Sequence, residues 1–407
     1  MSARLPFIFI LLTLMIDAMG VGLIMPVMPD LIRDVQGGDL ASAAIWGGIL
    51  ATAFAVMQFL FSPTLGSLSD RFGRRPVLLI SLVVMCLDYV VMAVAGTIWL
   101  LLLGRLVGGV TAATQATAAA FIADISAPEK KAQNFGLMSA AFGMGFVLGP
   151  LIGGLLASFG PRAPFVAAAV LAGLNVVLGY FVLPETVTDR IRRPFEWRRA
   201  NPFGAFKAIS QLEGVRPLLL IFFLYQLAFF VYPAVWAYFT QAKFGWSPQM
   251  IGLSLASFGI SMALIQGGLI RVILPRLGEY RTLLFGLVFN AFAFLLIATL
   301  PSGTAVLVLT PLTALGALAG PALQGMMSRM AQDNQQGELQ GLLGSIASIA
   351  VILSPLVMTQ TFSLFSREGA SPFFPGAPFL LSMVLMGVCL AVALRHRPAL
   401  PRDATET

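Results

Sequence analysis

Residues 66–76 read GSLSDRFGRRP, a short charged loop between long apolar runs at 43–65 and 77–96. Gly73 predicts a tight turn with positive φ, because a residue without a Cβ atom adopts that conformation at little cost. Asp70 suits a helix N-terminus, and the arginines suit acidic groups and helix C-termini. The loop therefore predicts a sharp turn between two helices, with charges that can pair with neighbouring elements.

Apolar runs like these two recur along the whole chain. Of 407 residues, 58% are hydrophobic and only 11% are charged, whereas a soluble globular domain has roughly 25% charged residues. A helix that spans a bilayer needs roughly 20 mostly apolar residues. The runs that meet this requirement are 6–27, 43–65, 77–96, 98–122, 135–159, 163–184, 217–240, 248–271, 282–300, 303–325, 339–362 and 376–394. The sequence therefore predicts an all-α membrane protein with twelve transmembrane helices.

The basic residues are distributed unevenly about these runs. With the N-terminus inside, 20 of the 25 lysines and arginines fall on one side of the membrane. Because positively charged segments resist translocation, we expect both termini to be cytoplasmic. The net charge of +7 therefore reflects topology and gives no reason to expect a nucleic-acid partner.

The longest polar stretch divides the chain into two halves. The expected parts are an N-terminal six-helix bundle at 1–184, a cytoplasmic linker at 185–216, a C-terminal six-helix bundle at 217–395 and a cytoplasmic tail at 396–407. The linker either lies on the membrane surface, with Trp197 in the interface, or is a solvated tether.

The two halves resemble each other weakly. Arg71-Phe72-Gly73-Arg74 aligns with Arg276-Leu277-Gly278-Glu279, in the loop after the second helix of each half. Internal duplication is common in secondary transporters, whose substrate sites lie near the membrane midplane between the halves.

Three ionisable residues lie deep in the predicted helices: Asp17, Asp88 and Arg105. Each costs roughly 2.5–3.5 kcal/mol to insert, so each is a functional candidate. Burial disfavours the ionised form of a carboxylate, which lets Asp17 and Asp88 bind and release a proton. The alternative for both acids is a structural hydrogen bond. Arg105 begins the pattern Arg105-x-x-x-Gly109, and it either tunes a nearby acid or has a structural role.

Other polar and aromatic groups at membrane depth could line a cavity for a large amphipathic ligand. Contacts between helices are the alternative for each of them. The candidates are Gln58, Thr114, Gln115, Gln226, Trp236, Gln266, Asn290 and Gln324.

No enzymatic constellation is present in the sequence. The sole histidine, His396, lies in the basic tail, and there is no nucleotide-binding loop and no spacing typical of metal ligands. We therefore expect a protein that is not an enzyme, has no cofactor or metal, and uses an ion gradient.

The charged loop matches the G-x-x-x-D-R-x-G-R-[RK] signature of the major facilitator superfamily, and the chain resembles that family. The matching residues are Gly66, Asp70, Arg71, Gly73, Arg74 and Arg75. The resemblance implies two pseudo-symmetric six-helix bundles and a cytoplasmic gate. In that gate Arg74 would pair with Asp124, and Asp70 would cap the helix that begins near Gln336. The alternative is a basic anchor with no mechanical role.

A second motif, GFVLGPLIGG, matches the G-x-x-x-G-P-x-x-G-G signature of the antiporter members. Its residues are Gly145, Gly149, Pro150, Gly153 and Gly154. Glycines four residues apart make a smooth strip for another helix, and proline bends its own helix. The motif favours export over import.

Longer stretches are similar to the tetracycline exporters, among them LMIDAMGVGLIMPVMPDL at 14–31 and GRLVGGVTAATQATAAAFIAD at 104–124. The resemblance implies a proton-coupled drug antiporter of the bacterial inner membrane. Asp17 and Asp88 match acidic positions of these exporters, Arg105 matches an arginine linked to proton transfer, and Gln226 matches a glutamine.

Two positions depart from the exporter pattern. Met262 stands where many tetracycline exporters have a histidine, and Asn290 stands where they have an acid. Neither side chain can titrate. We therefore expect poor export of metal-chelated tetracycline and a different amphipathic substrate.

The sequence thus predicts proton-coupled export of a small amphipathic compound by alternating access. We expect a monomer in the lipid bilayer whose partners are its substrate and protons. The alternatives are a facilitator or importer of an endogenous metabolite and, in another class, a non-transporting receptor or scaffold.

Overall fold

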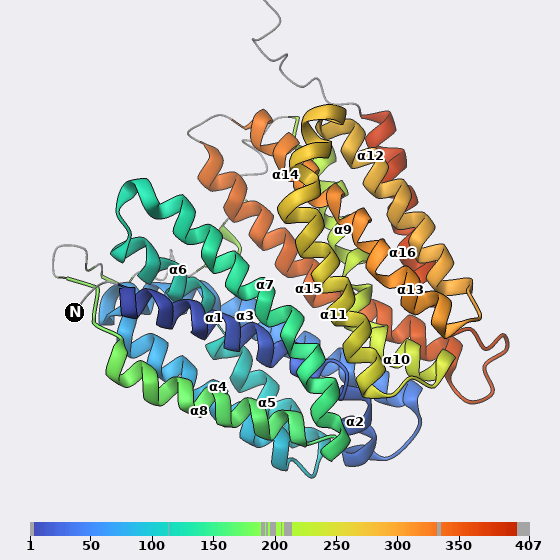
Figure 1. The fold of residues 1–407 in the computed structure, drawn as a ribbon, viewed down its shortest axis with the longest axis horizontal. Coiled ribbons are helices and arrows are strands. Elements are labelled where there is room, and N and C mark those ends of the chain that lie inside the picture. The colour runs from blue at the N-terminus through green and yellow to red at the C-terminus, as the bar shows by residue number, and fades with distance from the viewer. Residues whose placement is uncertain are drawn as a thin grey trace, which may run out of the picture. The chain divides into compact units, whose positions relative to one another are not determined.

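The computed structural model describes residues 4–112, 114–188, 192, 194–195, 201–204, 206, 214–331 and 335–396. Regular structure in these residues is helical (Figure 1). The first half contains α1 (Arg4–Ile24), α2 (Met28–Gln36), α3 (Leu40–Phe72), α4 (Arg74–Val94), α5 (Ile98–Thr111), α6 (Thr114–Ile125), α7 (Lys131–Leu156) and α8 (Ala163–Val182). Trp197 and most of the predicted linker lie outside the described residues.

In the described part of the second half there are eight α-helices, joined at two places by short π-helical or 3-10 segments. The α-helices are α9 (Arg216–Phe229), α10 (Val231–Phe244), α11 (Pro248–Leu264), α12 (Ile270–Thr299), α13 (Gly303–Thr313), α14 (Ala319–Met330), α15 (Gln336–Ser366) and α16 (Ala377–Arg395). A π-helical segment, η4 (Ile265–Leu269), joins α11 to α12, and a 3-10 segment, η5 (Ala314–Leu318), joins α13 to α14.

Eleven helical stretches within the described residues are long and apolar enough to cross a membrane. One of them, Pro248–Thr299, has 52 residues. At 1.5 Å per residue it would be about 78 Å long, far longer than a hydrocarbon core of about 30 Å. Gly278, with φ 74° and ψ 165°, breaks this stretch between the predicted spans 248–271 and 282–300. The structure therefore confirms the predicted all-α membrane protein with twelve spans.

Contacts between residues divide the chain into two compact units. Unit 1 comprises Met1–Pro202 and Gly245–Ala256, and unit 2 comprises Phe203–Phe244 and Ser257–Thr407. In unit 1, α1 packs on α7 and α4 packs on α8; in unit 2, α9 packs on α15 and α12 packs on α16 (Figure 1). Corresponding helices therefore pair in the same way, so a structural repeat accompanies the weak sequence repeat.

The glycines of α7 bring its backbone against α1. A Cβ atom at Gly149 would lie 2.5 Å from the carbonyl oxygen of Met19, and one at Gly145 would overlap the carbonyl oxygen of Met15. Small residues allow this close approach. The strip predicted from GFVLGPLIGG is therefore the face on which α1 lies.

The same motif also contacts the beginning of α11. A Cβ atom at Gly154 would lie 2.6 Å from the carbonyl oxygen of Pro248, and one at Gly252 would overlap that of Pro150. Gly145 and Gly149 thus lie against α1, whereas Gly154 lies against the start of α11, all within unit 1.

Replacing Gly149 with alanine should destabilise the protein by about 1–3 kcal/mol, because the added methyl group meets backbone atoms that cannot rotate away. Gly143→Ala is the matched control, since a Cβ atom there meets nothing within 4 Å. Thermal unfolding in detergent should show a lower melting temperature for Gly149→Ala only. Equal melting temperatures for the two variants would contradict the close packing of α1 and α7.

Candidate functional site

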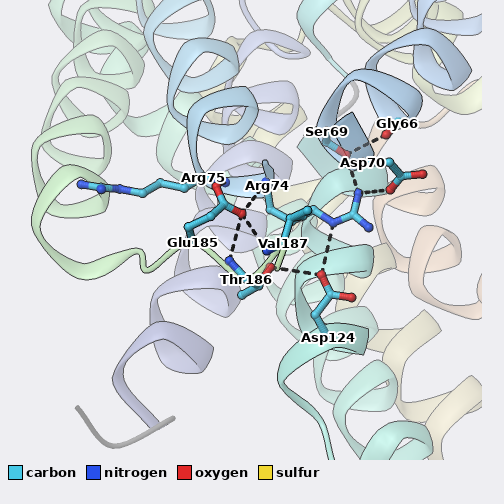
Figure 2. A network of polar contacts seen from close by, with 9 residues as sticks. All are labelled: Gly66, Ser69, Asp70, Arg74, Arg75, Asp124, Glu185, Thr186 and Val187. Carbon is cyan, nitrogen blue, oxygen red and sulfur yellow. Dashed lines mark hydrogen bonds and ion pairs between the residues drawn. The ribbon is translucent and has the colours of Figure 1, made fainter. Parts of the chain in front are cut away.

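The charged loop forms a compact polar network (Figure 2). Gly73 lies between α3 and α4 with φ 112° and ψ 151°. Arg74 pairs with Asp70 on one side and with Asp124 on the other, where its Nε lies 3.3 Å from Oδ2. It also donates a hydrogen bond to the hydroxyl of Ser69, at 2.6 Å. The expected contact between Arg74 and Asp124 is therefore present.

Glu185 supplies negative charge to the N-terminus of α4. Its two carboxylate oxygens accept hydrogen bonds from the backbone N–H groups of Arg74, at 2.9 Å, and Arg75, at 3.2 Å (Figure 2). These N–H groups have no partner inside their own helix, and a carboxylate is favoured at this end of the helix dipole. A Cβ atom at Gly73 would lie 2.6 Å from Cδ of Glu185, so glycine leaves room for the carboxylate.

Sequence analysis did not assign a role to Glu185. Two features of the sequence could have indicated its role. Glu185 directly follows the sixth apolar run, and the N-terminal turn of α4 contains arginines and no acid that could interact favourably with the helix dipole. Arg75 also links the start of α4 to the end of α8. Its guanidinium donates a hydrogen bond to the carbonyl oxygen of Tyr180, at 2.8 Å, and lies over the aromatic ring of the same residue.

The other residues of the charged loop have smaller roles in the network. The carbonyl oxygen of Gly66 accepts a hydrogen bond from the hydroxyl of Ser69, at 2.8 Å. Arg71 is exposed and lies over the ring of Phe72, 5.0 Å from its centre.

Asp88 and Arg105 form a buried ion pair in unit 1. Their side chains are 4% and 10% exposed, and the guanidinium also lies 5.2 Å from the centre of the Phe54 ring. A Cβ atom at Gly104 or Gly108 would lie 2.9 or 2.8 Å from a carboxylate oxygen of Asp88. The two glycines thus shape a slot in α5 that holds the carboxylate beside the guanidinium.

Asp17 has a different environment from Asp88. Its Oδ1 is buried and has no hydrogen-bond partner among the described residues. Tyr89 is 4% exposed, and its ring occupies the space beside Gly20, one turn of α1 from Asp17. The Tyr89 hydroxyl is close enough to interact electrostatically with Asp17, Arg105 and Asp88. Sequence analysis missed Tyr89, although it directly follows an embedded acid.

A cavity of about 200 Å³ lies between α1, α6 and α7 in unit 1. Gln115, one of the predicted cavity residues, contributes to its wall. Three of the apolar lining residues are spaced by three or four positions and so share one face of α7. That spacing was the signal that sequence analysis overlooked. The lining residues are Leu14, Gln115, Phe135, Met138, Ser139 and Phe142.

The other predicted cavity residues have varied environments. Gln266 and Gln324 are exposed, Gln58 and Gln226 are partly buried, and Thr114, Trp236 and Asn290 are buried.

Two of the buried residues pack helices of unit 2 together. Trp236 is 1% exposed and contacts the rings of Tyr232 and Phe379. The amide of Asn290 donates a hydrogen bond to the carbonyl oxygen of Gly316 in η5, at 2.9 Å. Met262, the other position that departs from the exporter pattern, packs against an apolar cluster centred on Ile265, Ala314 and Leu318.

Comparison with known proteins gives consistent matches. The family model described as the Major Facilitator Superfamily matches residues 10–309 and 218–407. The class C tetracycline resistance protein of Escherichia coli is 46% identical over 298 residues, which are 73% of this chain and 74% of that protein. The class D protein of Salmonella ordonez is 37% identical over 401 residues, which are 98% of this chain and 99% of that protein.

More distant relatives share the fold. Multidrug resistance protein 2 of Bacillus subtilis is 30% identical over 311 residues, which are 74% of this chain and 75% of that protein. The fold also matches the crystal structure of a bacterial homolog to the human lysosomal transporter Spinster, with a TM-score of 0.76. The two sequences are 17% identical, and the match covers 97% of each chain.

Neutralising Asp88 alone should be strongly destabilising. Asp88→Asn leaves the Arg105 charge buried without its partner, which costs about 3–5 kcal/mol in such pairs. The double variant Asp88→Asn/Arg105→Gln should recover most of this loss, because no buried charge remains. A double-mutant cycle by thermal unfolding in detergent measures the coupling. Losses that simply add would show that the two side chains do not depend on each other.

Proposed function

The chain belongs to the major facilitator superfamily, and we propose that it is a secondary active transporter that exports a small amphipathic compound in exchange for protons. The observation that carries this proposal is the contrast between Asp17, for which the described residues provide no ion pair, and the neighbouring Asp88–Arg105 pair. The tetracycline resistance proteins that are 37–46% identical to this chain support drug efflux as its function.

Asp17 is the group that carries the proton in this proposal. An ionised carboxylate buried without a partner is costly, and a bound proton removes that cost. Asp88 differs from Asp17 because the guanidinium of Arg105 lies in contact with it and favours its charged form. Tyr89 interacts electrostatically with both acids, so the environment of its hydroxyl group depends on the charge of each. Proton binding at Asp17 therefore changes the charge of unit 1 at one defined place.

The two bundles, 1–184 and 217–395, alternate between inward and outward openings, and the linker 185–216 joins them on the cytoplasmic side. The network around Arg74 acts as the cytoplasmic gate. The glycine strip of α7 lets α1 and the start of α11 slide on it, because no side chains interlock there. We place both termini in the cytoplasm of a bacterium and expect a monomer that uses the proton gradient and needs no cofactor.

The cavity in unit 1 takes the apolar part of the substrate. Phe135, Met138 and Phe142 offer aromatic and thioether surface, and Gln115 and Ser139 offer hydrogen bonds. Ligand sites are mostly apolar with a few placed polar groups, and this cavity of about 200 Å³ has room for part of an amphipathic molecule.

Export is favoured over the alternatives. The relatives in the comparison are named for resistance to drugs, and a transporter confers resistance by moving the compound outward. A receptor or scaffold would have no use for a charged latch that can open, and a metabolite importer would not need the antiporter glycine motif.

Asp17→Asn should reduce proton-driven exchange by about a hundredfold, as expected for a group that carries the proton, and should leave folding intact. Exchange of ethidium, an amphipathic test cation, is measured in proteoliposomes with an imposed pH gradient. Asp30→Asn is the control, because Asp30 forms a partly exposed ion pair with Arg33 outside the predicted spans. Exchange that persists at the wild-type rate in Asp17→Asn would refute the assignment.

Metal-chelated tetracycline should be a poor substrate. Met262 and Asn290 cannot supply the charged hydrogen-bonding groups that many tetracycline exporters have at these positions. A hydrogen bond to a charged group is worth about 1.5–3 kcal/mol, so the lack of one such bond to the chelate lowers its affinity by about tenfold or more. The measurement is tetracycline resistance in a sensitive host that expresses, at equal levels, either this protein or a tetracycline exporter with a histidine and an acid at the two positions. Similar resistance from the two proteins would show that Met262 and Asn290 do not restrict the substrate.

A further inference from the structure

An apolar groove lies on the surface of unit 1 between α4 and α8, with a volume of about 240 Å³. Two of its lining residues, Leu79 and Val176, also pack against the buried core of this unit, so the bottom of the groove belongs to the packed bundle. Three lining residues are partly buried and form the floor, and three are exposed and form the walls: Leu79, Val84 and Val176, and Ile80, Val83 and Tyr180.

The sequence builds this groove by its spacing. On α4 the lining residues recur at intervals of three to four positions, and Val176 lies one turn from Tyr180 on α8, so each helix contributes one face. The backbones approach at Gly179, where a Cβ atom would lie 3.2 Å from Cδ2 of Leu79. Valine occupies three of the six lining positions, and its short side chain leaves the space between the two helices unfilled.

The groove is restricted to one half of the predicted spans 77–96 and 163–184. Val84 lies ten residues beyond Arg74, the first residue of α4, which corresponds to about 15 Å along the helix. This is about half of a hydrocarbon core of about 30 Å. The groove therefore has the depth of a single leaflet, where exposed apolar side chains meet the acyl chains of lipids.

A cation lies at the end of the groove that is nearest to the charged loop. The Arg75 guanidinium donates a hydrogen bond to the carbonyl oxygen of Tyr180 and lies 5.5 Å from the centre of its ring. Figure 2 shows the Arg75 side chain directed away from the acids around Arg74. Glu185 accepts a hydrogen bond from the backbone N–H of Arg75. Within the described part of the chain, no carboxylate forms an ion pair with the guanidinium.

This combination of groups is complementary to a phospholipid with a negative charge. Arginine binds phosphate groups through parallel N–H···O bonds, and basic pockets between helices on the cytoplasmic side recognise anionic headgroups. Tyrosine suits the same depth, because its ring is apolar and its hydroxyl is polar. A topological role alone would explain the charge of Arg75 and leave the adjacent groove unexplained.

We propose that the groove between α4 and α8 binds one anionic phospholipid of the cytoplasmic leaflet. An acyl chain lies along Leu79, Val83 and Val84, and the headgroup phosphate binds Arg75. The lipid covers the seam and stabilises the contact between the cytoplasmic ends of the two helices. This site is separate from the cavity between α1, α6 and α7, so the inference does not rest on the proposed transport function.

The test measures lipid binding to the purified wild-type protein in detergent by native mass spectrometry. The probes are phosphatidylglycerol, which is anionic, and phosphatidylcholine with the same acyl chains, which is zwitterionic. Phosphatidylglycerol should bind about fivefold more tightly, the preference expected from one arginine beside an anionic headgroup. Equal binding of the two lipids would overturn the proposal.

Variants of Arg75 identify the group that recognises the charge. Arg75→Gln should remove the preference, and Arg75→Lys should retain most of it because the charge remains. Arg281→Gln is the matched control, since Arg281 is exposed on the same predicted side of the membrane but belongs to unit 2. Both lipids are measured on each variant, so the ratio of their affinities does not depend on its stability. The same preference in Arg75→Gln as in Arg281→Gln would refute the headgroup site.

A variant of Val83 tests the acyl-chain site. Val83→Trp should fill the groove and weaken the binding of both lipids by about tenfold, because the indole displaces about two methylene groups from apolar contact. Val90→Trp is the matched control, since Val83 and Val90 are 41% and 42% exposed on the same helix and Val90 lies outside the groove. Equal binding by the two tryptophan variants, or a wild-type dimer without bound lipid, would show that the groove has another occupant.

Discussion

A charge inside an apolar helical bundle must be compensated or neutralised, and this requirement organises the functional half of the molecule. Arg105 compensates Asp88, and glycines on both sides of the arginine make space for the carboxylate. Breaking such a pair is far more costly than removing both charges, so the two residues behave as a single structural element. Asp17 has no such partner. A proton bound to the Asp17 carboxylate would neutralise it, and this is the basis of the proposed coupling between proton binding and transport.

The same requirement acts at the helix ends, where backbone N–H groups carry partial positive charge. Gly73 and Gly278 both have positive φ, and at each of them a carboxylate lies at the first turn of the helix that follows. In unit 1 the carboxylate belongs to Glu185, which is 111 residues from Arg74 along the chain. In unit 2 it belongs to Glu279, which directly follows Gly278. The first loop thus receives its carboxylate from the start of the linker, whereas the second has a carboxylate of its own.

The separation of two interacting residues along the chain decides whether the sequence could predict their contact. Twelve spans, the turn at Gly73 and the embedded position of Asp17 follow from local composition, and the structure agrees with them. Glu185 and Tyr89 were missed because their partners lie on other helices, and a single sequence does not show which helices pack together. Trp236 lies on a helix that is apolar on nearly every side, so its orientation toward the packed core could not be inferred from periodicity.

Embedded charge and aromatic bulk are distributed unequally between the two units. Within the described residues, unit 1 contains Asp17, Asp88 and Arg105 at membrane depth, whereas the charged side chains of unit 2 lie at or near helix ends. The interior of unit 2 is instead filled by packed rings around Trp236. These rings are close-packed like other protein interiors, so they bury apolar surface and provide no group that could bind a proton. If protons act on unit 1 alone, proton binding changes the charge of unit 1 and leaves the charges of unit 2 unchanged, so the electrostatic part of the coupling belongs to the first half of the chain.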